Sequence, residues 1–205
     1  MTPRNILHVD LDAFFCSVEE ILDPELIGKA FVVGGRPDGR GVVASASYAA
    51  RAYGIRSAMP TAQALRLAPG LIILSSRHGV YSQHSKKVMD HLRQSAPIIQ
   101  QISIDEAFLD VSAAQHSGEE LARQWQDEIM GLFKLPTSWG IASNKLVAKI
   151  ATEVGKPGGA LLIHSDDEQY RRLFRVSEGL VVDLDPVRGY PALAVRLNVH
   201  ACLSF

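Results

Sequence analysis

Acidic residues stand at two points of the sequence where an apolar run ends. Asp10 and Asp12 close the run that begins at Ile6, and Asp105 and Glu106 interrupt the stretch ISIDEAFLD. A carboxylate at the end of a buried strand costs free energy unless something compensates its charge. If the two segments are neighbours, three carboxylates converge, and a divalent cation would relieve their repulsion. Oxygen ligands without a nearby cysteine favour Mg²⁺ or Mn²⁺ over Zn²⁺, and two such ions about 4 Å apart support phosphoryl transfer.

The same acids have simpler interpretations. Asp12 precedes a helical pattern, so a helix-capping role is the preferred interpretation for this residue. Asp10 and the pair Asp105-Glu106 could equally be acids that merely end strands, as many do. The DLD motif alone also occurs in haloacid-dehalogenase phosphatases and in sugar transferases. The first of these is disfavoured because Phe14 stands where such a phosphatase has Thr or Val.

The elements that position these acids can be predicted from the pattern of apolar residues. We expect a strand at 6–10, a helix at 12–22, and neighbouring strands at 98–105 and 107–111. Because side chains alternate along a strand, Asp10 should share a face with Ile6 and His8, whereas Leu11 should point to the other face.

The remaining patterns alternate between helices and strands. They predict a hairpin from the runs 30–34 and 41–45, helices at 48–53 and 61–67, and strands at 71–74 and 139–142. Three longer helices should bury one face each, through Tyr81, Val88 and Leu92, through Leu121, Trp125, Ile129 and Leu132, and through Leu146, Ile150 and Val154. The second of them begins with a capping box at Ser117 and Glu120, and the third ends at Gly155. The hairpins favour an α+β fold with a mixed or antiparallel sheet.

Composition limits the class of protein. The chain has 205 residues, of which 47% are hydrophobic, and a formal net charge of -1. A core of useful size is therefore available, but contact with a polyanion would have to come from local patches. Two cysteines and the lack of a long apolar run near residues 1–5 lead us to expect a cytoplasmic protein without a membrane contact.

Four motifs, taken together, resemble the Y-family translesion DNA polymerases, most of all the bacterial DNA polymerase IV branch. They occur in the order VDLDAFFCSVEE, SASYAARAYGIRSAMP, SIDEAFLDVS and GIASNKLVAKIATEVGKP, and the resemblance covers roughly residues 4–165. It implies a polymerase palm, a ferredoxin-like antiparallel sheet backed by helices, formed by residues 1–24 and 76–165. It also implies a small fingers domain at residues 25–75.

The resemblance implies a role for each matching residue. The metal-binding and catalytic carboxylates would be Asp10, Asp105 and Glu106, with the main-chain carbonyl of Leu11 as a further metal ligand. The cofactor would be two Mg²⁺ ions, which Mn²⁺ could replace. The incoming nucleotide would meet Phe15 as a steric gate against a ribose 2′-hydroxyl, with its phosphates held by the side chains of Tyr48, Arg51 and Lys156. Ser45 lies near the same site and could donate a further hydrogen bond.

Without the resemblance, several of these residues would be read differently. Phe15 would more often be a core residue, Tyr48 a packed aromatic residue, and Arg51 a solvated charge.

The expected function is template-directed DNA polymerisation of the translesion type, with primer-template DNA and deoxynucleoside triphosphates as partners. Family members continue with thumb and little-finger domains, whereas residues 166–205 have no clear period and remain unassigned. We therefore expect weak, distributive synthesis, because phosphate contacts would be missing. The alternative is a non-catalytic fragment that binds DNA or a protein partner. The sequence leaves open the binding of a sliding clamp and the oligomeric state.

Overall fold

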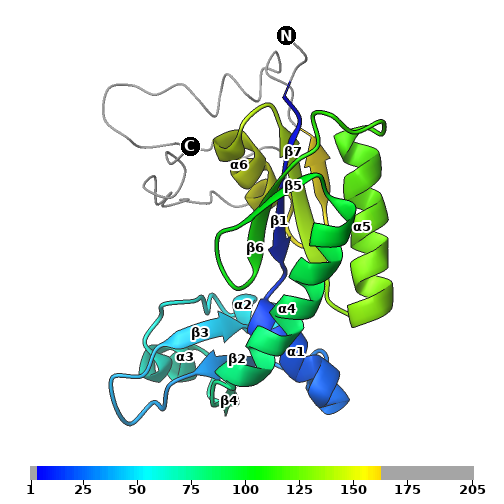
Figure 1. Cartoon of the computed structure of the whole chain (residues 1–205). Coiled ribbons are helices and arrows are strands. Elements are labelled where there is room, and N and C mark those ends of the chain that lie inside the picture. Colours follow the sequence, from blue (N-terminus) through cyan, green and yellow to red (C-terminus); the bar gives the residue numbers. More distant parts are fainter. Residues whose placement is uncertain (1–3, 163–205) are drawn as a thin grey trace, which may run out of the picture.

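The two acidic segments lie on neighbouring strands of a five-stranded sheet (Figure 1). The computed structural model describes residues 4–162, and all structural statements refer to this range. The strand order is β5 (Ile98–Gln101), β6 (Glu106–Asp110), β1 (Ile6–Leu11), β7 (Thr137–Ala142) and β8 (Ala160–Leu162). Neighbours are antiparallel except for β7 and β8, which are parallel. Strand β8 had not been predicted, and β5 ends four residues earlier than expected.

The central strand β1 separates two cores. Leu7, Val9 and Leu11 belong to the larger core, which lies against α1 (Phe14–Leu22), α4 (His78–Ser95) and α5 (Gly118–Phe133). Ile6 belongs to a second core formed with α6 (Lys145–Gly155). On this second face the His8 ring nitrogen Nδ1 lies 2.9 Å from the Thr152 hydroxyl of α6. The predicted alternation is therefore confirmed, and it places Asp10 on the side of the sheet that α6 covers.

Helices α5 and α6 begin at capping residues, the first of them as predicted. Ser117 and Glu120 form the complete capping box before α5, and Asn144 accepts a hydrogen bond from the amide of Val147 at the start of α6. Along α5, Trp125 and Ile129 are buried as predicted. The prediction for Leu132 was wrong, because its side chain is 63% exposed near the end of the helix.

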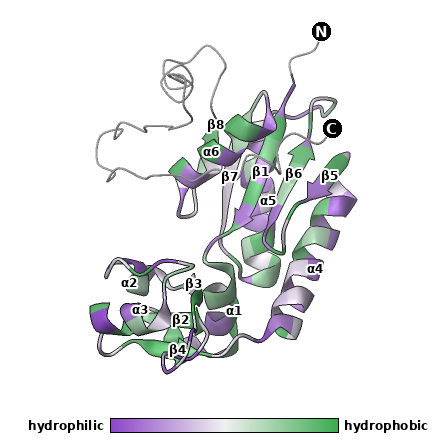
Figure 2. Ribbon diagram, turned by 90° about the vertical axis from the view of Figure 1, so that its left-hand side faces the viewer, coloured by the Kyte–Doolittle hydropathy of each residue, from purple (hydrophilic) through white to green (hydrophobic). Residues whose placement is uncertain are grey.

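Residues 25–75 form a second, smaller sheet with its own core. Strand β2 (Phe31–Gly34) lies between β3 (Val43–Ala46), which is antiparallel to it, and β4 (Ile72–Leu74), which is parallel. The helices of this part are η1 (Pro24–Leu26), α2 (Tyr48–Arg51) and α3 (Thr61–Leu67). Both sheets carry apolar strands (Figure 2), and the core of the smaller one includes Val32, Val43, Ala50, Ile55 and Ala64. We call this part the small unit, and residues 4–24 with 76–162 the large unit.

The α+β fold class is confirmed, with mixed sheets backed by helices. Within residues 4–162 no helix has both the length and the apolar character that a membrane span requires. The unassigned segment 166–205 lies outside the described residues.

Candidate active site

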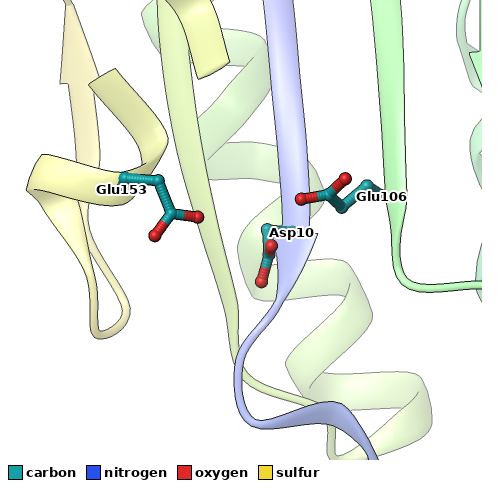
Figure 3. Close-up of side chains that lie close together, drawn as sticks. All are labelled: Asp10, Glu106 and Glu153. Atoms are coloured by element: carbon teal, nitrogen blue, oxygen red, sulfur yellow. The ribbon is translucent and has the colours of Figure 1, made fainter. Parts of the chain in front are cut away.

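Asp10 and Glu106 face each other across the pairing of β1 with β6. Their Cα atoms are partners in the antiparallel ladder, so both side chains leave the same face of the sheet (Figure 3). Ser138 of β7 is the partner of Asp10 on the other side. The Asp10 side chain is almost completely buried. The register of three strands thus brings together two acids that are far apart in the sequence.

Asp105 lies just before β6 and is joined to the end of β1 through the main chain. Its carbonyl oxygen accepts a hydrogen bond of 3.0 Å from the amide of Leu11. Its carboxylate accepts a hydrogen bond of 2.5 Å from the Ser103 hydroxyl. Burial raises the pKa of Asp105, and the Ser103 hydrogen bond acts against this shift. Asp105 therefore belongs to the same end of the sheet, as predicted.

Glu153 of α6 is a third carboxylate at this position, and it was missed from the sequence. Oxygen atoms of Asp10, Glu106 and Glu153 lie within 4.8 Å of one another (Figure 3). The signal was available, because Lys149 and Glu153 are four residues apart and so share one side of α6. The three oxygen donors, in a largely buried setting, suit a hard cation such as Mg²⁺ or Mn²⁺.

Two lysines neutralise these acids in the structure. The Lys149 ammonium donates to Glu106 over 2.7 Å. The Lys156 ammonium lies 2.8 Å from Asp10 and 2.5 Å from Glu153. Burial raises the pKa of the Asp10 carboxyl to about 8, and the Lys156 ammonium opposes this shift. Although burial lowers the pKa of Lys156, the Asp10 and Glu153 carboxylates raise it to about 12.

A cavity of about 200 Å³ opens between the carboxylates and the small unit. It brings together most of the predicted site, since it is lined by Asp10, Leu11, Phe15, Ser45, Arg51, Asp105 and Lys156. The first residues of α1 also line it, and a helix N-terminus favours an anion. Glu106 and Tyr48 are predicted site residues that do not line this cavity.

The small unit contributes Tyr48 and Arg51 from one turn of α2. Ser47 caps this short helix by accepting a hydrogen bond from the amide of Ala50. The Arg51 guanidinium lies 4.7 Å from the centre of the Tyr48 ring, and its Nε donates to the carbonyl of Ala46. The prediction that the two side chains share one side of a helix is confirmed. Arg51 is held in place while it lines the cavity.

Phe15 is supported by aromatic and charged neighbours that sequence reasoning had not assigned to the site. Its ring stacks on that of Tyr81, with ring centres 4.3 Å apart. The Tyr81 hydroxyl donates to Glu19, which is buried and also accepts from Arg77. Tyr81 had been predicted only as a core residue of its helix.

The preferred interpretation of Asp12 as a helix cap was wrong. The residue at the N-cap of α1 is Ala13, which has a positive φ of 44° and makes no side-chain cap. The Asp12 carboxylate turns away from the helix and accepts hydrogen bonds from Ser138 and Gly158. The left-handed residue between β1 and α1 changes the direction of the chain, and this local geometry could not be read from the motif.

The chain is similar to known proteins over most of its length. Residues 9–153 match the model of the impB/mucB/samB family. The DNA polymerase IV of Desulfatibacillum aliphaticivorans is 46% identical over 172 residues, which is 82% of this chain and 43% of the relative. That of Pseudomonas aeruginosa (strain UCBPP-PA14) is 44% identical over 163 residues, with 78% and 47% covered.

Solved structures give the same result. The insertion ternary complex of Dbh DNA polymerase has a TM-score of 0.76 and 37% identity, covering 82% of this chain and 51% of the other. DinB from Sulfolobus solfataricus has a TM-score of 0.76 and 36% identity, with 82% and 50% covered. The chain spans about half the length of the relatives that it matches.

Proposed function

The chain belongs to the impB/mucB/samB family, and from this premise we propose that it acts in template-directed DNA synthesis of the translesion type. In this proposal it adds deoxynucleotides to a primer 3′-hydroxyl. The observation that carries the proposal is the common cavity. Asp10 in β1, Asp105 just before β6 and basic residues from both units line one space, which suits a metal-bound triphosphate.

The two sheets support a division into domains. We assign residues 1–24 and 76–165 to the palm and residues 25–75 to the fingers, because residues 25–75 have a core of their own, in addition to Leu26, Phe31 and Val33, which join the larger core. In this assignment the cavity lies where the fingers meet the palm.

The carboxylates of Asp10, Asp105 and Glu106 and the carbonyl of Leu11 are the groups that would hold Mg²⁺ or Mn²⁺. Glu153 is close enough to assist. Bound divalent ions would neutralise the phosphates and favour deprotonation of the primer hydroxyl.

The basic side chains around the cavity would hold the triphosphate. The Arg51 guanidinium, already oriented by Ala46 and Tyr48, can bind phosphate oxygens in a bidentate manner. The Lys156 ammonium and the start of α1 add positive charge and N–H donors. Ser45 can donate one further hydrogen bond.

Phe15 is proposed to select nucleotides with deoxyribose over those with ribose. Its ring lines the cavity and is supported from behind by Tyr81, so it cannot easily move away from a 2′-hydroxyl. This arrangement would favour deoxynucleotides over ribonucleotides.

The test is primer extension at low salt with Mg²⁺ or Mn²⁺, comparing the chain with the double variant Asp105→Ala, Glu106→Ala. We expect extension by the first protein and none by the second. Equal incorporation by both would assign the activity to a contaminant. Nucleotide binding without extension would instead support the alternative of a non-catalytic binding protein.

A further inference from the structure

Asp12 is a buried acid whose polar atoms form hydrogen bonds with several separate segments of the chain. Only 1% of the residue is exposed. Its amide donates to the carbonyl of Pro136 over 2.9 Å, and its carbonyl accepts from the Ser17 hydroxyl over 2.6 Å. These two hydrogen bonds fix the backbone of Asp12, and its buried carboxylate needs hydrogen-bond donors of its own.

The carboxylate of Asp12 holds the segment that follows α6. The amide of Gly158 donates to its Oδ2 atom over 2.8 Å, and the Ser138 hydroxyl lies 2.9 Å from both carboxylate oxygens. The same Gly158 amide lies 2.9 Å from the Ser138 hydroxyl. Gly158 is two residues beyond Lys156, so these hydrogen bonds restrain the backbone from which the Lys156 side chain reaches the cavity.

Asp12 also reaches the small unit. Burial and, next, the charge of the nearby Asp12 carboxylate raise the pKa of the Tyr48 phenol. Tyr48 in turn lies beneath the Arg51 guanidinium. One carboxylate of the large unit is therefore linked to Lys156 through Gly158 and to Arg51 through Tyr48.

We propose that Asp12 is a positioning residue of the nucleotide site, which places Lys156 through Gly158 and places Arg51 through Tyr48. The inference rests on the proposed function, since it assumes that these side chains bind a triphosphate. It assigns no contact with substrate to Asp12 itself. The loss of its carboxylate should weaken binding of the phosphates and leave recognition of the base unchanged.

The first test needs no nucleotide and no activity. Amide hydrogen exchange is measured on the chain and on its Asp12→Asn and Asp12→Ala variants, with Asp110→Asn as the matched control. Asp110 is likewise an acid that accepts from a serine hydroxyl and a backbone amide, but it lies at the far end of β6. We expect the Gly158 amide to exchange about tenfold faster in Asp12→Ala, with an intermediate rate in Asp12→Asn. Unchanged exchange at Gly158 would overturn the proposal.

The second test measures how tightly the chain binds three probes in the presence of Mg²⁺. The probes are dATP, dCTP and inorganic tripolyphosphate. We expect Asp12→Asn to weaken all three by a similar factor of about ten, and Asp110→Asn to weaken none. In a Tyr48→Phe background the loss should be smaller, because one connection is already absent. Weakening of a single nucleotide, or an affinity unchanged in Asp12→Asn, would contradict the positioning role.

The two tests separate the proposals. If the chain without substitutions binds none of the three probes, the proposed function fails, while the exchange of Gly158 still decides whether Asp12 holds that segment. If Asp12→Ala does not fold, the near-isosteric Asp12→Asn variant and a Ser138→Ala variant carry both measurements.

Discussion

The two walls of the cavity differ in charge and in how they are built. The large unit supplies the carboxylates of Asp10 in β1 and of Asp105 just before β6, placed by the pairing of these strands, with the ammonium of Lys156 beside them. The small unit supplies Arg51 from a helix of four residues. Residues 25–75 contain six lysines and arginines and two acidic residues, although the whole chain has a formal net charge of -1. The near-neutral total hides this separation.

The difference indicates that each wall suits one part of a metal-bound triphosphate. The acidic wall needs long-range pairing, because buried carboxylates must be held together against their repulsion. The basic wall can be local, because a guanidinium on one short turn reaches phosphate without burial. Substitutions on the acidic wall should therefore affect chemistry, and those on the basic wall should affect nucleotide affinity.

The largest effect is expected for Glu106→Gln, which removes the acid paired with Asp10 next to the acidic wall. Loss of one carboxylate should lower the rate of nucleotide incorporation about 1000-fold, since bound metal ions contribute several kcal/mol to such reactions. Single-turnover primer extension is the measurement, and Asp110→Asn on the same strand is the control. A loss of less than tenfold would show that Glu106 is not essential to the acidic wall.

The next effect concerns the framework behind the acidic wall. A Cβ atom at Gly140 would lie 1.9 Å from the carbonyl oxygen of Ala148 and 2.5 Å from the amide nitrogen of Thr152. Gly140→Ala should therefore push α6 from the sheet and cost about 3 kcal/mol of unfolding free energy, measured by urea denaturation.

Gly131→Ala is the control for this substitution. Gly131 lies near the end of α5, and a Cβ atom there would meet nothing within 4 Å. Alanine should stabilise the helix by about 0.5–1 kcal/mol. Equal effects of the two substitutions would contradict the close approach of α6.

On the basic wall, Arg51→Ala should raise KM for the nucleotide about 10- to 100-fold and change kcat much less. Arg51→Lys should recover little, since lysine cannot make bidentate contacts or stack on Tyr48 in the same way. Steady-state kinetics at varied nucleotide concentration measure this, with Arg66→Ala in α3 as the control. A change mainly in kcat would place Arg51 with the acidic wall.

The smallest effect is expected for Asp10→Asn, which should stabilise the folded chain when metal ions are absent. The pKa of Asp10 is raised to about 8, so the folded chain holds a proton that the unfolded chain releases near pH 4. Stability from this group is present below about pH 4 and is lost as the pH rises to about 8. Asn cannot ionise, so Asp10→Asn avoids this loss of stability. At pH 8 its free energy of unfolding should exceed that of the unsubstituted chain by about 1 kcal/mol.

Thermal unfolding in EDTA at pH 5 and pH 8 measures the effect. The difference between Asp10→Asn and the unsubstituted chain should grow with pH. A difference that shrinks between pH 5 and pH 8 would mean that the ion pair with Lys156 outweighs the burial of Asp10.

The elements of the fold could be predicted because their signals are local. The capping box at Ser117 and the alternation along β1 depend on neighbouring residues, and both agree with the structure. The short strand β8 could not be predicted in this way. Its three residues pair in parallel with β7, and nothing in their own sequence distinguishes them from a loop.

The candidate site, too, could be predicted only in part from the sequence. The sequence by itself determined which acids and bases are available and, through the four motifs, the family to which they belong. Only the tertiary structure decided that Glu153 joins Asp10 and Glu106, that Tyr81 supports Phe15, and that Asp12 binds Gly158 instead of capping a helix. These contacts join residues far apart in the chain, and their geometry depends on strand register and helix packing, which no local pattern contains.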